Sequence, residues 1–522
     1  MRRYLEPVVA FSAAAYLTLG CSGSLGRDPG GSEGTGTGGT GGVSATASGA
    51  GGAAIASETS DTAAAADPPK VPPSDFKQCM VTSDLLDPVF LTIPRARSMV
   101  TATQVRGELA GLMPEIPLPG TLRGPELLNY YHFDYPTTQV TEVIVVPELH
   151  GTSVLGQMVL QIGIQAPPVD SAHRRPTAVT VLVDTTKSME GESMARANAA
   201  VLALAESLNK GDVLNLVTTN PDVAPVHRVA AIAGDPALFA ADKPLTVSGA
   251  GDLGQALVQA YDAANDVDSY LAGGLNRLVV ITDGGGLPES IDARLIDDNW
   301  TKQHIDLVGV GVGLAPSYRP ALLDAATRAG HGANLYLDSV AEADAALHLR
   351  FDEVMDEALN DVSIGFQLPS IFEVVNPAAT TAAVSEGQLT TSDLGRGRSM
   401  VFRHAVGVCP NPDSAALAKT TMNVTVSWND PTLPDRQTRQ FPFPLVKVIS
   451  QTPSYAFLKT SVVVAFTNAL QSLEAARFEA ACQKIADVHT AYATHAADPE
   501  LDSIAAQINA HPIMVKAGKT CP

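Results

Sequence analysis

Oxygen-bearing side chains occur in two stretches of the sequence, each directly after an apolar run. Asp184, Thr186 and Ser188 alternate after residues 180–183, and Asp283 follows residues 278–282. A carboxylate and two hydroxyls at alternate positions can converge on one point, and hard divalent cations take oxygen ligands. Together the two stretches predict a site for Mg²⁺, Mn²⁺ or Ca²⁺, provided that the fold brings them together.

The surrounding region, residues 175–359, alternates between apolar strands and amphipathic helices. We expect strands at 177–183, 213–218, 226–232, 277–282, 304–312 and 333–337. Strands joined by helical crossovers form right-handed parallel units, so this region predicts a doubly wound, mostly parallel α/β sheet. Ligands bind at the carboxyl ends of the strands in such sheets, and the sequence places Asp184 and Asp283 there.

The segments on either side of this region have a different pattern. Residues 76–174 combine short helices with strands, residues 360–450 alternate with the period of two that is typical of antiparallel strands, and residues 451–522 are helical. Neither set of flanking strands covers a sheet by itself. We therefore expect the α/β domain to be inserted into one antiparallel β unit, with a helical segment at the C-terminus.

The first 75 residues have the composition of an export signal and a linker. Arg2 and Arg3 precede an apolar run at 8–20, which ends at Cys21. Residues 17–21 resemble the lipobox of bacterial lipoproteins, in which the cysteine is acylated; the alternative is an ordinary secretory signal. Residues 22–75 are rich in Gly, Ser, Thr and Ala and predict a disordered tether. We expect a lipid-anchored protein of the bacterial cell envelope, either periplasmic or surface-exposed.

Charge and motifs exclude several classes of function. The chain has 34 Lys and Arg against 55 Asp and Glu, a net charge of -21 that repels phosphate backbones and predicts no nucleic-acid partner. It contains no Walker loop, no Gly-x-Ser-x-Gly and no His-Glu-x-x-His, so no enzyme class is indicated. The alternative of an enzyme of unrecognised type rests on the acidic residues Glu353, Asp356 and Glu357, which we instead expect on the solvated side of a helix.

Four cysteines remain when Cys21 is set aside: Cys79, Cys409, Cys482 and Cys521. An even number in an exported chain favours disulfides, and four cysteines allow three pairings. We prefer Cys482 with Cys521, because both lie in the helical segment, and Cys79 with Cys409.

Residues 175–359 resemble a von Willebrand factor type A domain. The run 184–188 is similar to the Asp-x-Ser-x-Ser part of that family's metal-ion-dependent adhesion site, and residues 281–284 are similar to its later Thr-Asp-Gly. Outside the domain, residues 125–131 and 274–277 resemble segments of the YfbK-like bacterial lipoproteins. The resemblance implies that Asp184, Thr186 and Ser188 hold the ion, that Asp283 acts through water, and that an acidic residue of a protein partner completes the coordination.

The sequence departs from the family pattern at two positions. Gly251 stands where a threonine ligand is expected, and Lys187 brings a positive charge next to the site. Water or Asp252 could fill the vacant ligand position, whereas Lys187 could instead pair with Asp184 or Asp283. The alternative to a metal-dependent binding protein is therefore a metal-free domain in which both carboxylates hydrogen-bond to loop amides. Such a domain would serve as a structural or assembly module of the cell envelope.

Overall fold

The computed structural model describes most of the chain beyond residue 84. The described residues are 85, 89–92, 97–110, 122–135, 142–151, 156–235, 238, 244–249, 251–267, 273–285, 292–314, 318–374, 382–384, 392–408, 419–431, 433–450, 452–495 and 497–521. The predictions about the signal, the tether, Cys21, Cys79 and Cys409 lie outside these residues. Within the described part of the chain, no helix is both long and apolar enough to cross a membrane.

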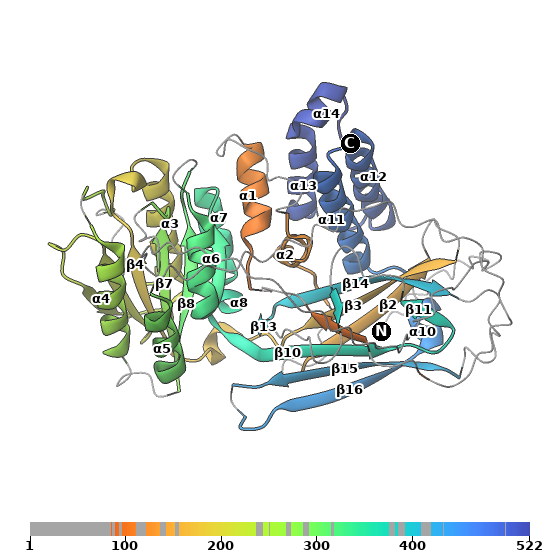
Figure 1. Ribbon diagram of the computed structural model, residues 1–522, viewed down its shortest axis with the longest axis horizontal. Helices are drawn as coiled ribbons and strands as arrows, with labels where there is room; N and C mark the ends of the chain where they lie inside the picture. Colours follow the sequence, from red (N-terminus) through yellow and green to blue (C-terminus); the bar gives the residue numbers. More distant parts are fainter. Residues whose placement is uncertain are drawn as a thin grey trace, which may run out of the picture.

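The α/β domain is built on a six-stranded sheet with the order β6-β5-β4-β7-β8-β9 (Figure 1). The strands are β4 (Thr177–Val183), β5 (Val213–Thr218), β6 (Val226–Val229), β7 (Leu275–Thr282), β8 (Ile305–Gly311) and β9 (His331–Tyr336). All pairs are parallel except β5 with β6. The expected strands are therefore present, but the third ends at Val229 and runs antiparallel at the edge.

Helices cover both faces of this sheet, which explains why its central strands are continuous apolar runs. In β7, Val279 and Ile281 pack toward α3 (Glu192–Ser207) and α7 (Val340–Asp344). Leu278 and Val280 pack on the other face, toward α4 (Leu253–Asn265), α5 (Ala293–Gln303) and α6 (Pro320–Ala329). Every residue of β4, β7 and β8 is buried.

The antiparallel unit consists of two sheets whose strands come from both sides of the α/β domain. Their orders are β12-β1-β10-β15-β16, with β13 also on β10, and β11-β14-β3-β2. The strands are β1 (Val89–Thr92), β2 (Ile144–Gly151), β3 (Gln157–Gln165), β10 (Glu357–Gln367), β11 (Phe372–Val374), β12 (Ala382–Val384), β13 (Ser392–Gly395), β14 (Ser399–Val408), β15 (Thr421–Asn429) and β16 (Gln437–Pro444).

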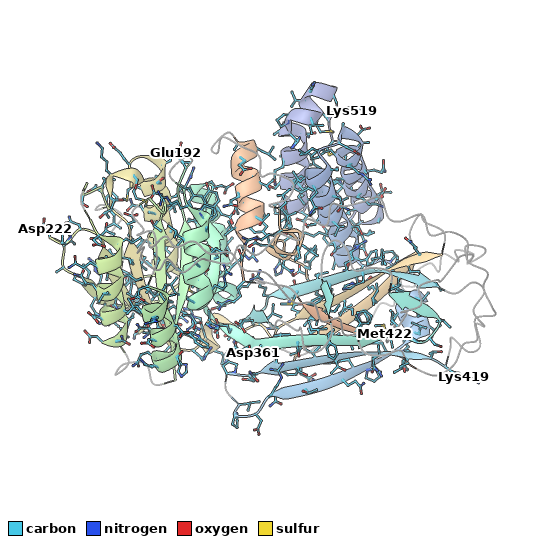
Figure 2. The ribbon with its side chains drawn as sticks, viewed as in Figure 1. Glu192, Asp222, Asp361, Lys419, Met422 and Lys519 are labelled. Carbon is cyan, nitrogen blue, oxygen red and sulfur yellow. A yellow bond between two sulfur atoms is a disulfide. The ribbon has the colours of Figure 1, made fainter. Side chains whose placement is uncertain are left out.

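The pairing of these strands confirms the predicted fold class. β1 pairs with β10, and β3 pairs with β14 over its whole length, so strands before and after the α/β domain share sheets. The chain leaves this unit after β3 and returns through β10, in which Asp361 is labelled in Figure 2. The α/β domain is thus an insertion between adjacent parts of one antiparallel unit.

A helical segment completes the structure. It comprises α11 (Tyr455–Ser472), α12 (Ala475–Ala491), α13 (Pro499–Ala510) and α14 (Pro512–Ala517), preceded by α10 (Leu445–Ser450). The predicted disulfide between Cys482 and Cys521 is present and links α12 to the C-terminal end. Helices α1 (Val100–Leu109) and α2 (Gly124–Tyr130) lie between the α/β domain and these helices (Figure 1).

The sequence prediction of a solvated acidic helix at residues 353–357 is wrong. A π-helical segment (Ala345–Leu349) and α8 (Phe351–Met355) follow α7, and Glu357 already begins β10. Asp356 is 1% and Glu357 9% exposed. Asp356 pairs with Arg175 and Arg396, and Glu357 with Arg97 and Arg277, so these acids bind the two units together instead of facing water.

Candidate functional site

Asp184 and Asp283 lie next to each other at the carboxyl edge of the sheet. They directly follow β4 and β7, which are neighbouring parallel strands. The strand order reverses between these two strands, because β5 and β6 lie to one side and β8 and β9 to the other. Such a switch point leaves a crevice where open α/β sheets bind ligands. Both carboxylates are fully buried there.

Four of the five predicted ligand residues form a continuous chain of side-chain oxygens. The hydroxyl of Thr186 donates to Oδ1 of Asp184 at 2.7 Å, and the hydroxyls of Thr186 and Ser188 are 3.1 Å apart. The hydroxyl of Ser188 donates to Oδ1 of Asp283 at 3.2 Å. The fold therefore brings the two stretches of sequence together, as their positions after neighbouring strands predicted.

Backbone amides and a further threonine fix the directions of the two carboxylates. Oδ1 of Asp184 also accepts from the amide of Thr186 at 2.9 Å, and its Oδ2 accepts from the hydroxyl of Thr282 at 2.7 Å. Oδ1 of Asp283 accepts from the amide of Gly285 at 2.8 Å. Thr282 was not among the predicted site residues, although its place immediately before Asp283 in a buried strand was a signal for it.

The donor set fits a small hard cation. In an octahedral Mg²⁺ site with bonds of 2.0–2.1 Å, neighbouring ligand oxygens are about 2.9 Å apart. The oxygens of Asp184, Thr186, Ser188 and Asp283 follow one another at 2.7, 3.1 and 3.2 Å. Rotation of the two hydroxyls would turn their lone pairs toward a shared ion without a large displacement. The same side chains also hydrogen-bond to one another, so their polar atoms have partners even without an ion.

The space next to Gly251 explains why no hydroxyl is supplied from that position. A Cβ atom at residue 251 would lie 2.7 Å from the carbonyl oxygen of Thr219 and 2.8 Å from its Oγ1. The Thr219 hydroxyl accepts from the amide of Thr185 at 2.9 Å, and the Thr185 hydroxyl lies 3.1 Å from that of Ser248. These hydroxyls were missed from the sequence, because Thr219 and Ser248 come from loops that only the fold brings beside residue 185.

Asp252 and Lys187 do not join the oxygen chain. The exposed Asp252 is the N-cap of α4, and its carboxylate accepts from the amide of Gln255 at 3.1 Å. Lys187 is exposed and, within the described part of the chain, forms no ion pair with Asp184 or Asp283. The pairing of Lys187 with either carboxylate, considered from the sequence, is therefore absent.

The two segments outside the oxygen-rich loops that resemble the lipoprotein family, residues 125–131 and 274–277, make contacts between elements of the fold. The side-chain oxygen of Asn129 in α2 accepts a hydrogen bond from the amide of Val401 at 3.2 Å. The backbone carbonyl oxygen of Asn129 accepts another from the side chain of Arg398 at 3.0 Å, so α2 is bonded to β14 and to the residue before it. Asn276 in β7 donates to the carbonyl oxygen of Ala264 in α4 at 2.9 Å. Arg277 pairs with Asp306 at 3.2 Å and Glu357 at 3.3 Å. These segments join the α/β domain to its surroundings and lie outside the oxygen chain.

Comparison with known proteins finds similarity at the level of solved structures. No protein-family model matches the chain, and no curated protein matches it. Similar structures include the ArnB paralog VWA2 of Sulfolobus acidocaldarius (13% identity, 72% of this chain and 97% of that chain, TM-score 0.32). A von Willebrand factor type A protein of Catenulispora acidiphila has 14% identity, 74% and 89% coverage, and a TM-score of 0.37. The pilus adhesin SpaC of Lactobacillus rhamnosus GG has 13% identity, 60% and 48% coverage, and a TM-score of 0.33.

These likenesses are distant, since all three TM-scores lie below 0.5. The strand order and the two loops by themselves define the class: a doubly wound α/β domain with an oxygen-rich site at its switch point.

Proposed function

We propose that this protein is an exported, lipid-anchored binding protein of the bacterial cell envelope. Its inserted domain, of the von Willebrand factor A type, engages a protein partner through a divalent cation that Asp184, Thr186 and Ser188 hold directly and Asp283 holds through water. The observation that carries the proposal is the continuous chain of oxygens at the switch point, spaced at 2.7, 3.1 and 3.2 Å. We assign it binding and no catalysis.

The exposure of the site supports binding to a partner. Asp184 and Asp283 are buried, Thr186 is half-buried and Ser188 is exposed. An ion beneath the two hydroxyls would therefore have protein ligands on its inner side and open positions toward solvent. A divalent cation that keeps open positions favours an anionic ligand, so an aspartate or glutamate of the partner is the expected contact.

The N-terminal region supplies the proposed attachment. Acylation of Cys21 would anchor the chain, and the Gly-, Ser-, Thr- and Ala-rich residues 22–75 would separate the anchor from the folded part. The site would then reach partners away from the membrane surface. Mass spectrometry of the mature N-terminus tests this part; an unmodified N-terminal residue contradicts it.

Calorimetry tests the metal. Titration of the wild-type chain with Mg²⁺ and with Mn²⁺ should give saturable binding, and Asp184→Ala should abolish it because the central carboxylate is lost. The melting temperature of the wild type should fall in EDTA. An absence of heat for the wild type together with an unchanged melting temperature in EDTA would remove the ion from the proposal.

Affinity capture from an envelope extract tests the partner. A protein retained by the wild type with Mg²⁺ should be lost in EDTA and with Asp184→Ala. The Asp252→Ala variant is a matched control, since its carboxylate caps α4 outside the oxygen chain. Capture that persists in both EDTA and Asp184→Ala contradicts metal-dependent engagement.

A metal-free structural or assembly module is the second candidate. It is favoured by the hydrogen bonds that already satisfy Asp184 and Asp283 and by the filled space beside Gly251. If the domain is metal-free, Asp184→Ala should lower its stability. Mg²⁺ should then leave the melting temperatures of both the wild type and Asp184→Ala unchanged.

A further inference from the structure

A second group of metal-binding side chains lies outside the sheet-edge site. Glu206 is near the C-terminal end of α3, Asp344 ends α7, and His348 belongs to the π-helical segment. Their ligand atoms all lie within 4.8 Å of one another, and all three residues are exposed. We propose that Glu206, Asp344 and His348 form a binding site for Zn²⁺.

The helices hold these three side chains in place. Asp344 and His348 are four residues apart, a spacing that puts two side chains on one helix face and serves helical metal ligands. Nδ1 of His348 lies 2.9 Å from Oδ1 of Asp344. The hydroxyl of Ser207 donates to the carbonyl oxygen of Leu347 at 3.1 Å, which ties the end of α3 to the segment that carries His348. The Ser207 hydrogen bond therefore holds the adjacent Glu206 close to His348.

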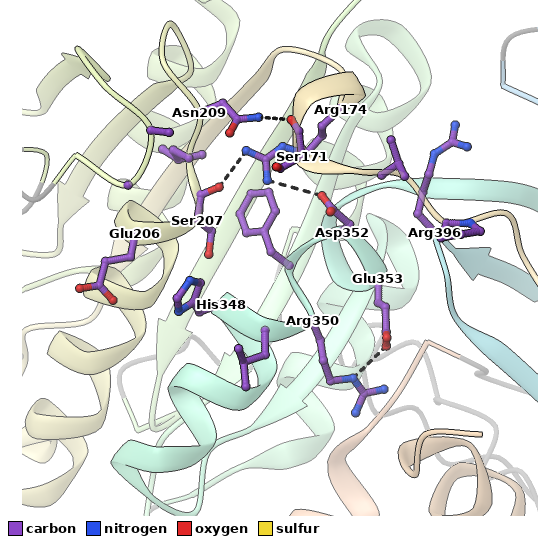
Figure 3. Close-up of a pocket in the computed structure, with 17 residues that line it drawn as sticks. Ser171, Arg174, Glu206, Ser207, Asn209, His348, Arg350, Asp352, Glu353 and Arg396 are labelled. Carbon is purple, nitrogen blue, oxygen red and sulfur yellow. Dashed lines mark hydrogen bonds and ion pairs between the residues drawn. The ribbon is translucent and has the colours of Figure 1, made fainter. Parts of the chain in front are cut away.

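A cavity adjoins two of the three ligands. Its volume is about 430 Å³, and both Glu206 and His348 line it. Figure 3 shows these two side chains near each other on one side of the cavity, with Asp352 and Arg396 on the other side. A metal held at the cavity rim would keep positions open toward this space, where water or a small ligand can complete the coordination.

The donor types favour zinc over magnesium. An imidazole nitrogen among the donors suits Zn²⁺, which binds nitrogen as well as carboxylate oxygen. Mg²⁺ prefers oxygen ligands alone. The two sites are also far apart, because α3 begins at Glu192, near the sheet-edge loop (Figure 2), and Glu206 lies about 20 Å away at its other end.

Zinc titration of the full chain tests the proposal. Calorimetry with ZnCl₂ should show a saturable event for the wild type that is weakened roughly tenfold or more in His348→Ala, Glu206→Gln and Asp344→Asn. Zn²⁺ should also raise the melting temperature of the wild type but not of His348→Ala. These side chains are exposed, so the variants should fold. Asp184→Ala should keep this event, because its site is separate.

His173→Ala is the matched control. His173 and Asp170 form an exposed pair at 2.7 Å, and no cluster of three potential ligands includes them in the described part of the chain. Zinc binding in this variant should equal that of the wild type. The proposal is overturned if the wild type shows no saturable zinc event, if His348→Ala binds zinc as well as the wild type, or if His173→Ala loses as much affinity as His348→Ala.

Discussion

Ser188 and Asp283 are 95 residues apart in the sequence, and the hydroxyl of Ser188 donates a 3.2 Å hydrogen bond to Oδ1 of Asp283. This contact closes the oxygen chain between the loops after β4 and β7. It exists because the two strands are parallel neighbours and end at the same edge.

Asp252→Ala should weaken α4 without affecting the proposed ion. Loss of the N-cap hydrogen bond to Gln255 should lower the free energy of unfolding by about 1 kcal/mol. Urea denaturation measures the stability, and titration with Mg²⁺ measures the ion. A loss of Mg²⁺ binding equal to that of Asp184→Ala would instead make Asp252 a ligand.

Gly251→Ala should destabilise the domain by about 1–3 kcal/mol, because the new Cβ would lie 2.7 Å from the carbonyl oxygen of Thr219. Gly151→Ala is the control, since nothing lies within 4 Å of a Cβ at that position. It should change the stability by less than about 0.5 kcal/mol. Equal denaturation midpoints for the two variants would contradict the close packing of Thr219 on Gly251.

Arg277→Met should cost about 3–5 kcal/mol, because it removes one of the two arginines that compensate the buried carboxylate of Glu357. Burial raises the pKa of Glu357, but Arg97 and Arg277 outweigh it and lower that pKa to about 2. Arg477→Met is the control, as its 3.9 Å pair with Glu474 is solvated. Comparable loss of stability in both variants would argue against a buried network at the junction.

His404 should make stability depend on pH between about 6.5 and 4. Burial in β14 lowers the pKa of His404 to about 4, whereas the unfolded value is about 6.5. The unfolded chain therefore binds an additional proton in this range, so stability falls as the pH is lowered.

The His404→Leu variant isolates this contribution. The decrease in the free energy of unfolding from about pH 7 to about pH 5 should be smaller in the variant by about 2 kcal/mol. Urea titrations at both pH values measure it, with the exposed His489→Leu as control. Parallel pH profiles for wild type and His404→Leu would show that His404 is not the group responsible.

Reduction of the Cys482–Cys521 disulfide should destabilise the helical segment. The bond closes a separation of 39 residues, and removal of such a link costs about 2–4 kcal/mol in the chain-entropy account. The melting temperature of the wild type should fall in a reducing agent. Cys482→Ala should have the lower melting temperature already and should respond less to the reductant.

The central strands and the site loops were predictable because their signals are local. Strands buried on both faces are continuous apolar runs, as in β4, β7 and β8, and the loops that follow them carry Asp184 and Asp283. The period-two flanks also predicted an insertion, since neither flank could cover a sheet alone. The antiparallel direction of β6 was not predictable, because an edge strand of four residues carries little pattern.

The sequence by itself determined the alternation of strands and helices, the types of side chain at the sheet edge and the positions of the five cysteines. Only the tertiary structure decided that Glu357 is buried against Arg97 and Arg277, that Thr219 occupies the space beside Gly251, and that Glu206 lies close to His348. The physical reason is that burial and pairing depend on segments distant in sequence, whereas periodicity and loop composition depend on neighbours along the chain.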